Sequence, residues 1–264
     1  MIRCSTLPLL AKMLVVLSGG CAPVEPLGRV ARVGATQAQV AGAGAEVGAS
    51  SGADLASLDV PGFLPAVFFS PAGDGLRPLV VAAHGAGGSP DWECEYWRRL
   101  TRDSAFVLCL RGTAMGGDSF YFENHHALRA ELAAAIGAAQ ARAPRIAPGS
   151  GIYAGFSQGA SMGSLVVTTQ AQQLPYVVLI EGFEQWNIAL GRSFERKGGK
   201  GVLFACGTTQ CATKADRSQL ALSKTGLRAR AKHAVGAGHT PVGAVQQAVT
   251  ENLAWLVEGD PLWK

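Results

Sequence analysis

Short apolar runs alternate with longer mixed segments through most of the chain. From residue 61 onward, apolar runs predict strands at 64–69, 79–83, 105–110, 151–155, 176–180 and 202–206, and residues 227–235 alternate as an edge strand would. The segments between them predict helices at 89–103, 127–143, 158–168, 214–223 and 240–257. A turn at 71–75 predicts that the first two strands form a hairpin. Continuous apolar strands separated by helices are typical of a mainly parallel, doubly covered sheet, so the pattern predicts an α/β fold.

The first 58 residues do not follow this alternation. Arg3 and Lys12 precede a short apolar run and a few small residues, an arrangement that predicts an export signal at residues 1–20. That apolar run is too short to span a bilayer. Residues 21–58 are rich in alanine, glycine, valine and serine and almost free of aromatic side chains, so they cannot bury enough apolar surface to fold alone. They predict a flexible tether.

The end of the export signal resembles a bacterial lipobox, in the segment Leu17-Ser18-Gly19-Gly20-Cys21. In that interpretation Cys21 becomes the lipidated first residue of the mature protein and anchors it to a membrane. Ser18 stands where leucine is usual, and the alternative is ordinary cleavage that leaves Cys21 free or in a disulfide. Either route predicts an exported protein, held in the cell envelope on the periplasmic side or the outer membrane, or secreted.

Length and charge narrow the picture further. A chain of 264 residues with 48% hydrophobic content suffices for one large α/β domain, expected at residues 59–264, but not for two such domains and a leader. The chain carries 23 basic and 19 acidic residues, and two of the basic ones lie in the predicted export signal. This near balance gives no reason to expect a nucleic-acid partner.

A glycine-rich element, Gly155-Phe156-Ser157-Gln158-Gly159, lies where the strand at 151–155 meets the helix at 158–168. A serine in such a turn presents its hydroxyl outward, and the flanking glycines avoid collisions with neighbouring backbone. The five-residue pattern alone also occurs in ordinary glycine-rich turns. It is typical of a nucleophile elbow.

Two further elements stand at the positions that nucleophilic catalysis requires. The loop His84-Gly85-Ala86-Gly87-Gly88 follows the strand at 79–83 and is of the type that supplies an oxyanion-hole amide. His239 lies just before the last predicted helix, which the sequence begins with Thr240 as N-cap and Pro241 in its first position. The order along the chain is oxyanion loop, serine, histidine.

These motifs resemble those of the α/β-hydrolase superfamily, and within it the serine esterases of the acyl-protein thioesterase, carboxylesterase and polyester-depolymerase groups, over residues 60–258. The resemblance implies hydrolysis of a carboxylic ester or thioester through an acyl-enzyme on Ser157, with His239 as general base. The backbone amides of Gln158 and of Ala86 or Gly87 would form the oxyanion hole. No cofactor or metal is implied.

Hydrolases with a large lid insert the lid between the strands that correspond to 176–180 and 202–206. In this chain the segment between these two strands has only about twenty residues. The resemblance therefore implies no lid domain and an open site. An open site suits an ester substrate that is bulky or polymeric.

The acid of the catalytic triad is the family element that is missing. The family normally places it after the seventh strand in a Gly-Thr-x-Asp segment, whereas this chain has Cys206-Gly207-Thr208-Thr209-Gln210-Cys211. Asp216, further along, is slightly favoured, with Glu181 at the end of an earlier strand as the alternative and Glu184 third. Since the acid chiefly orients the histidine, a site without it would keep weaker catalysis. The gap leaves open a second function, a non-catalytic envelope lipoprotein that uses the fold as a binding module.

The sequence contains six cysteines, of which Cys4 lies in the leader and Cys21 in the lipobox. The even number that remains in an exported chain favours two disulfides. We expect Cys94–Cys109 and Cys206–Cys211, although four cysteines allow three pairings and free thiols in a cytosolic protein are the alternative. The cysteine spacing and the scattered histidines do not predict a zinc site.

Overall fold

Strands and helices alternate along residues 55–263, the part of the chain that the computed structural model describes. The strands are β1 (Ala56–Leu58), β2 (Ala66–Phe69), β3 (Leu79–Ala83), β4 (Phe106–Leu110), β5 (Thr113–Gly116), β6 (Ser119–Tyr121), β7 (Ile152–Phe156), β8 (Tyr176–Ile180), β9 (Gly201–Cys206) and β10 (Arg228–His233). The helices are α1 (Pro90–Leu100), α2 (His125–Arg142), α3 (Gln158–Val166), α4 (Ile188–Arg196), α5 (Thr209–Leu222) and α6 (Ala244–Leu256). The export signal and Cys21 lie outside the described residues, as does most of the tether.

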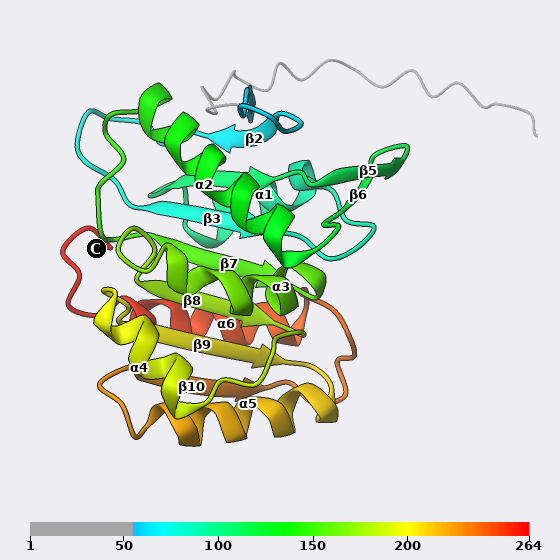
Figure 1. Cartoon of the computed structure of the whole chain (residues 1–264), viewed down its shortest axis with the longest axis vertical. Coiled ribbons are helices and arrows are strands. Elements are labelled where there is room, and N and C mark those ends of the chain that lie inside the picture. The colour runs from blue at the N-terminus through cyan, green and yellow to red at the C-terminus, as the bar shows by residue number, and fades with distance from the viewer. Residues whose placement is uncertain (1–54, 264) are drawn as a thin grey trace, which may run out of the picture. The chain divides into compact units, whose positions relative to one another are not determined.

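Eight of the strands form one sheet in the order β1-β2-β4-β3-β7-β8-β9-β10 (Figure 1). The pairs from β4 to β10 are all parallel, while β2 is antiparallel to both β1 and β4. The predicted mainly parallel sheet is confirmed, and the strand with alternating charge, β10, lies at an edge of it. The expected hairpin of β2 with β3 is wrong, because β4 lies between them in the sheet.

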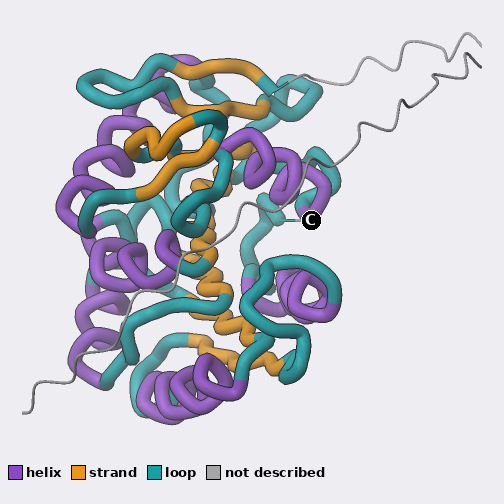
Figure 2. Tube along the Cα trace, turned by 90° about the vertical axis from the view of Figure 1, so that its right-hand side faces the viewer, coloured by secondary structure: helices purple, strands orange, loops and turns teal. Residues whose placement is uncertain are grey.

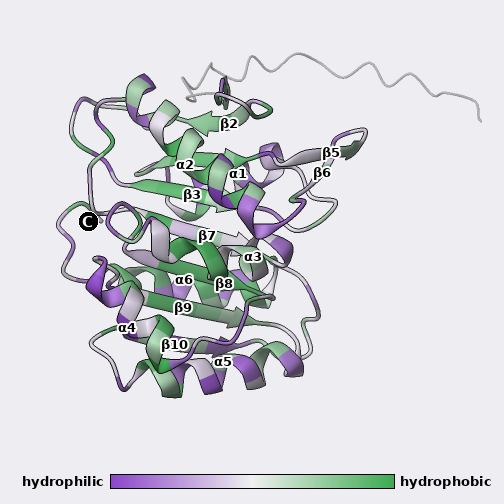
Figure 3. Cartoon of the chain, in the orientation of Figure 1, coloured by the Kyte–Doolittle hydropathy of each residue, from purple (hydrophilic) through white to green (hydrophobic). Residues whose placement is uncertain are grey.

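Helices cover both faces of this sheet. Helices α1 and α6 pack on one face and α2, α3, α4 and α5 on the other, so the sheet lies between two helical layers when viewed edge-on (Figure 2). Strands β3, β8 and β9 are hydrophobic along most of their length (Figure 3) because both of their faces are buried. Two apolar cores result, one on each side of the sheet.

Two helices, α5 and α6, begin several residues away from the predicted start. Helix α5 starts at Thr209 rather than at 214, because the Thr208 hydroxyl accepts a hydrogen bond from the Cys211 amide and caps it early. Helix α6 starts at Ala244, after Gly243 with a φ of 64°, so the expected start at Thr240 is wrong. The Thr240 hydroxyl instead accepts from the Val242 amide within a loop. His239 therefore lies in a connection between β10 and α6, not at a helix start.

Both expected disulfides are present. Cys94–Cys109 joins α1 to β4, and Cys206–Cys211 joins the end of β9 to the first turn of α5. The segment after β8 contains only the nine-residue helix α4, and no large lid covers the described domain. Within residues 55–263 no helix is both apolar enough and long enough to cross a bilayer.

Candidate active site

Ser157 occupies the sharp turn between β7 and α3. Its backbone has a φ of 50° and a ψ of −110°, a region that non-glycine residues adopt at a cost of about 1–3 kcal/mol. A Cβ on Gly159 would overlap the carbonyl oxygen of Ala83, and one on Gly155 would stand 2.7 Å from the Ala160 amide nitrogen. The two glycines are therefore required for α3 to approach the sheet. The backbone at Ser157 forms the sharp strand-to-helix turn that the sequence predicts.

His239 contacts both Ser157 and an acid. Its Nε2 lies 2.8 Å from the Ser157 Oγ, and its Nδ1 lies 3.3 Å from the Glu181 Oε2. An ionised carboxylate only accepts hydrogen bonds, so the Nδ1–H of the neutral ring donates to Glu181 and the Nε2 lone pair accepts from the serine hydroxyl. This is the hydrogen-bond order of a serine triad.

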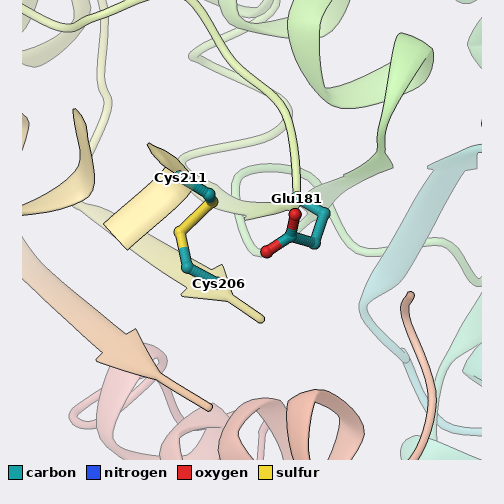
Figure 4. A group of neighbouring side chains, drawn as sticks. All are labelled: Glu181, Cys206 and Cys211. Atoms are coloured by element: carbon teal, nitrogen blue, oxygen red, sulfur yellow. A yellow bond between two sulfur atoms is a disulfide. The ribbon is translucent and has the colours of Figure 1, made fainter. Parts of the chain in front are cut away.

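Glu181 follows directly after β8 and is held by the loop that follows β9. Its side chain is 1% exposed, and its Oε1 accepts hydrogen bonds from the amides of Gly207 and, at 2.8 Å, Thr208. The Thr208 hydroxyl donates to Oε2 at 3.1 Å. These donors satisfy a carboxylate that would otherwise be costly to bury. The Cys206–Cys211 disulfide lies beside the same carboxylate (Figure 4).

The preference for Asp216 as the acid is corrected by this geometry. Asp216 lies within α5, with a side chain that is 63% exposed and paired with His233 at 2.8 Å. Glu184 is exposed. The structure brings the second candidate, Glu181, to His239 instead.

Glu181 also carries a backbone signal. Its φ is 52°, so it is one of four non-glycine residues with positive φ in the described chain, and Ser157 is another. A Cβ on the next residue, Gly182, would lie 2.5 Å from the Ser157 carbonyl oxygen. An acid followed by glycine at the end of a buried strand is thus the local sequence feature that points to this residue. Thr208 was missed because nothing in its local sequence relates it to a carboxylate that lies 27 residues earlier in the chain.

The oxyanion loop is fixed by its own hydrogen bonds. The Gly87 amide donates to the Phe120 carbonyl at 2.8 Å, and the Phe120 amide donates to the Gly88 carbonyl at 2.9 Å. The Gly87 amide is therefore engaged, whereas those of Ala86 and Gln158 have no hydrogen-bond acceptor among residues 55–263. Of the two loop residues that the sequence left open, Ala86 is the one with a free donor.

His84 supports this loop from below. Its ring is 1% exposed, and its two nitrogens face the carbonyl oxygens of Gly85 at 2.7 Å and Arg111 at 3.1 Å. Burial lowers the pKa of His84, so the ring is neutral and donates to one of the two carbonyls. Its stacking on Phe122, with ring centroids 4.9 Å apart, holds it in place. His84 shapes the loop rather than reaching the serine.

Two cavities flank the triad. One of about 470 Å³ is lined by the oxyanion loop and by apolar side chains that include Trp92, Phe156 and Pro241. The other, of about 190 Å³, is more polar and is lined by Glu181, His239, Thr208 and side chains from the start of α5. A larger cavity of about 670 Å³ lies beside Glu131, and neither the triad nor the oxyanion loop contributes to its lining. We therefore associate the chemistry with the two smaller cavities.

Comparison with known proteins identifies the fold. Neither a protein-family model nor a curated protein matches the sequence. Among solved structures, esterase PE8 is similar with a TM-score of 0.56 at 19% identity, over 76% of this chain and 100% of that one. The Bacillus cereus carboxylesterase has a TM-score of 0.52 at 17% identity, over 72% of this chain and 92% of that one. The Pyrococcus horikoshii acylaminoacyl peptidase has a TM-score of 0.56 at 10% identity, over 77% of this chain and 39% of that one.

These similarities, together with the parallel sheet and the elbow, show that the chain has the α/β-hydrolase fold. At such identities they establish the fold alone, because one scaffold of this kind hosts many chemistries. Any statement on the reaction must therefore come from the residues at the carboxyl ends of the strands.

Proposed function

We propose that this protein is a serine hydrolase that cleaves carboxylic ester or thioester bonds. The observation that carries the proposal is the continuous hydrogen-bonded order Ser157, His239, Glu181, on a backbone where the serine is held in a strained turn. A serine hydroxyl is a poor nucleophile until a neighbouring base takes its proton, and a neutral imidazole at 2.8 Å is positioned to take it. Glu181 orients that imidazole.

The reaction follows from these contacts. The Ser157 Oγ attacks the carbonyl carbon while His239 Nε2 accepts its proton, and the oxyanion binds to the amides of Ala86 and Gln158. Loss of one such donor costs roughly 3–4 kcal/mol of transition-state stabilisation. His239 then gives the proton to the leaving alcohol or thiol, and a water molecule, deprotonated by the same nitrogen, hydrolyses the acyl-enzyme.

Access to the site supports a bulky substrate. The His239 side chain is 53% exposed, and the triad lies between an apolar cavity and a polar one. A long acyl group fits the apolar cavity beside Trp92, while the remainder of a large ester extends into solvent. We therefore expect turnover of long-chain or polymer-borne esters rather than of small molecules alone.

The test is hydrolysis of p-nitrophenyl esters from acetate to palmitate by the whole chain and by its Ser157→Ala variant. We expect activity with the first and none above background with the second, while a Ser223→Ala control at the exposed end of α5 keeps full activity. Labelling by a fluorophosphonate should follow the same pattern, because it requires an activated serine and no particular substrate. Wild-type protein that is folded, oxidised and unlabelled would overturn the proposal.

The alternative, a binding module without catalysis, rested on the missing acid at Gln210. With Glu181 beside His239, that reason no longer favours it. Export and lipidation at Cys21 remain predictions from the sequence. Mass spectrometry of the protein recovered from membranes would test them, since a lipidated protein begins at Cys21 and carries acyl chains.

A further inference from the structure

The acid of the triad lies next to a pair of cysteine sulfurs. The Glu181 carboxylate and the sulfurs of Cys206 and Cys211 offer three ligand atoms within 4.8 Å of one another, and all three residues are buried (Figure 4). Two thiolates bound to one zinc ion at about 2.3 Å are at most about 4.6 Å apart, and a carboxylate oxygen binds at about 2.0–2.2 Å. The spacing of the three groups is thus compatible with a metal site. The two sulfurs cannot bind a metal as thiolates while they are joined in the disulfide.

The position of this disulfide makes it the more reducible of the two. Cys211 lies in the first turn of α5, where the helix dipole stabilises a thiolate and therefore the reduced form of the disulfide. It is 8% exposed and lines the 190 Å³ cavity beside the triad, whereas Cys94 and Cys109 are both 0% exposed. A loop of five residues also gains little chain entropy from closure. A reductant therefore reaches and opens Cys206–Cys211 first.

Reduction would leave two thiols and a carboxylate, a donor set that suits a thiophilic divalent cation. The Nδ1 of His239 lies 3.3 Å from Oε2 of the same carboxylate and is a candidate fourth ligand. Whether or not His239 itself binds the metal, a metal bound to Glu181 competes with the Nδ1–H of His239 for Oε2. The orientation of the histidine depends on that oxygen, so occupancy of the site and catalysis exclude each other.

We propose that reduction of Cys206–Cys211 creates, with Glu181, a binding site for a thiophilic divalent cation such as Zn²⁺, and that the bound ion switches the hydrolase off. The inhibitory consequence rests on the proposed function, whereas the metal site itself does not. With a water-soluble phosphine as reductant, the disulfide and one water yield two thiols and the phosphine oxide. The disulfide accepts two electrons from phosphorus, and water supplies the oxide oxygen and the two thiol protons. The cation then displaces those protons.

Binding is tested on the whole chain, reduced with the phosphine, desalted without oxygen and titrated with Co²⁺ as a spectroscopic probe for Zn²⁺. We expect sulfur-to-cobalt charge-transfer absorption that saturates near one equivalent and is displaced by Zn²⁺. The Cys206→Ser/Cys211→Ser variant should lose this signal, and the matched Cys94→Ser/Cys109→Ser variant should keep it. Equal signals from both variants, or none from reduced wild type, would overturn the metal site without bearing on the proposed function.

Inhibition is tested by ester hydrolysis with and without Zn²⁺. We expect Zn²⁺ to lower kcat/KM of the reduced wild type more than tenfold, reversibly with a chelator, and to leave the oxidised protein within twofold. The ratio of kcat/KM with and without Zn²⁺ is taken within each protein, so a difference in folding between proteins does not affect it. Zn²⁺ that binds the reduced protein but leaves turnover unchanged would overturn the switch. Oxidised wild type that hydrolyses no ester would instead refute the proposed function.

Discussion

Two histidine–acid pairs lie near the end of the sheet that carries Ser157, and only one of them contacts that serine. His233 at the end of β10 pairs with Asp216 on α5 at 2.8 Å, whereas His239 pairs with Glu181 at 3.3 Å. Judged by the histidine–acid distance alone, the first pair is the better bonded. Yet Asp216 is 63% exposed and Glu181 1% exposed, and Ser157 lies at the other nitrogen of His239.

The difference shows what makes an acid useful to a histidine. A pair exposed to water gains little, because both groups are well solvated when apart. Glu181 has lost its water, and fixed amide donors hold it in one orientation. It can therefore impose one tautomer on His239. Burial with preorganised donors, rather than a short contact, separates a catalytic acid from a surface ion pair.

Exchanging each acid for its amide should break the comparison most directly. Glu181→Gln should lower kcat of ester hydrolysis by roughly 10³- to 10⁴-fold, the scale seen when the acid of a serine triad becomes an amide, because the histidine then adopts the wrong tautomer. Asp216→Asn should change it less than twofold. Steady-state kinetics on one p-nitrophenyl ester measure both. A larger loss in the Asp216 variant would return the acid role to the exposed pair.

Glu93 shows what burial with a single donor does. On α1 it is 2% exposed, its Oε1 accepts from the Trp97 indole N–H at 3.1 Å, and its Oε2 has no partner in the described chain. Burial raises the pKa of Glu93 from 4.5 to about 7. The folded state thus holds a proton that the unfolded state releases at lower pH, so its contribution to stability is complete below pH 4.5 and is lost as pH rises through 7.

Between pH 4.5 and pH 8 the ionisation of Glu93 should lower the free energy of unfolding of the wild type by about 3 kcal/mol, at about 1.4 kcal/mol for each pKa unit. The Glu93→Gln variant should not show this decrease. Urea unfolding at a series of pH values measures it. Glu95→Gln is the control, because Arg98 and Arg99 lower the pKa of partly exposed Glu95 to about 2 and its carboxylate stays ionised in the folded state throughout. Parallel pH profiles for wild type and Glu93→Gln would show that Glu93 ionises freely.

Thr208 supplies one of the donors that distinguish Glu181, and its removal should have the smallest effect. Thr208→Val keeps the shape of the side chain but loses both the hydroxyl's cap of the Cys211 amide and its bond to Oε2, the latter worth about 1–1.5 kcal/mol, so kcat should fall about five- to tenfold with little change in KM. Thr213→Val, on the exposed surface of α5, is the matched control. A change confined to KM would mean that Thr208 contacts substrate instead of positioning the acid.

The fold was largely readable from the sequence because its central strands are continuous apolar runs. The elements that escaped prediction are β1, β5, β6 and α4, which are short or bury few side chains. The order of strands was not readable, since the hairpin turn between β2 and β3 gives no sign that β4 will insert between them.

Within the site, local sequence motifs predict Ser157 and His239, whereas no such motif predicts the acid. Glu181 follows β8, and its donors lie in the loop after the neighbouring parallel strand β9, which lies beside it only after the sheet has formed. Glu93 has a subtler signal, because it shares a helical face with Tyr96, Trp97 and Leu100, all of which are buried. An acid in an apolar stripe is therefore visible in the sequence, but its pKa is not.

The same parallel sheet sets the order in which the protein becomes active. Ser157 and His239 are 82 residues apart, and the His239 loop has a fixed position only after β10 has docked on β9 at the edge of the sheet. Contacts between such distant segments close slowly, after local helices have formed. Recovery of hydrolysis during refolding should therefore lag behind recovery of the helical circular dichroism signal. The rate at which hydrolysis returns would then measure the docking of β10.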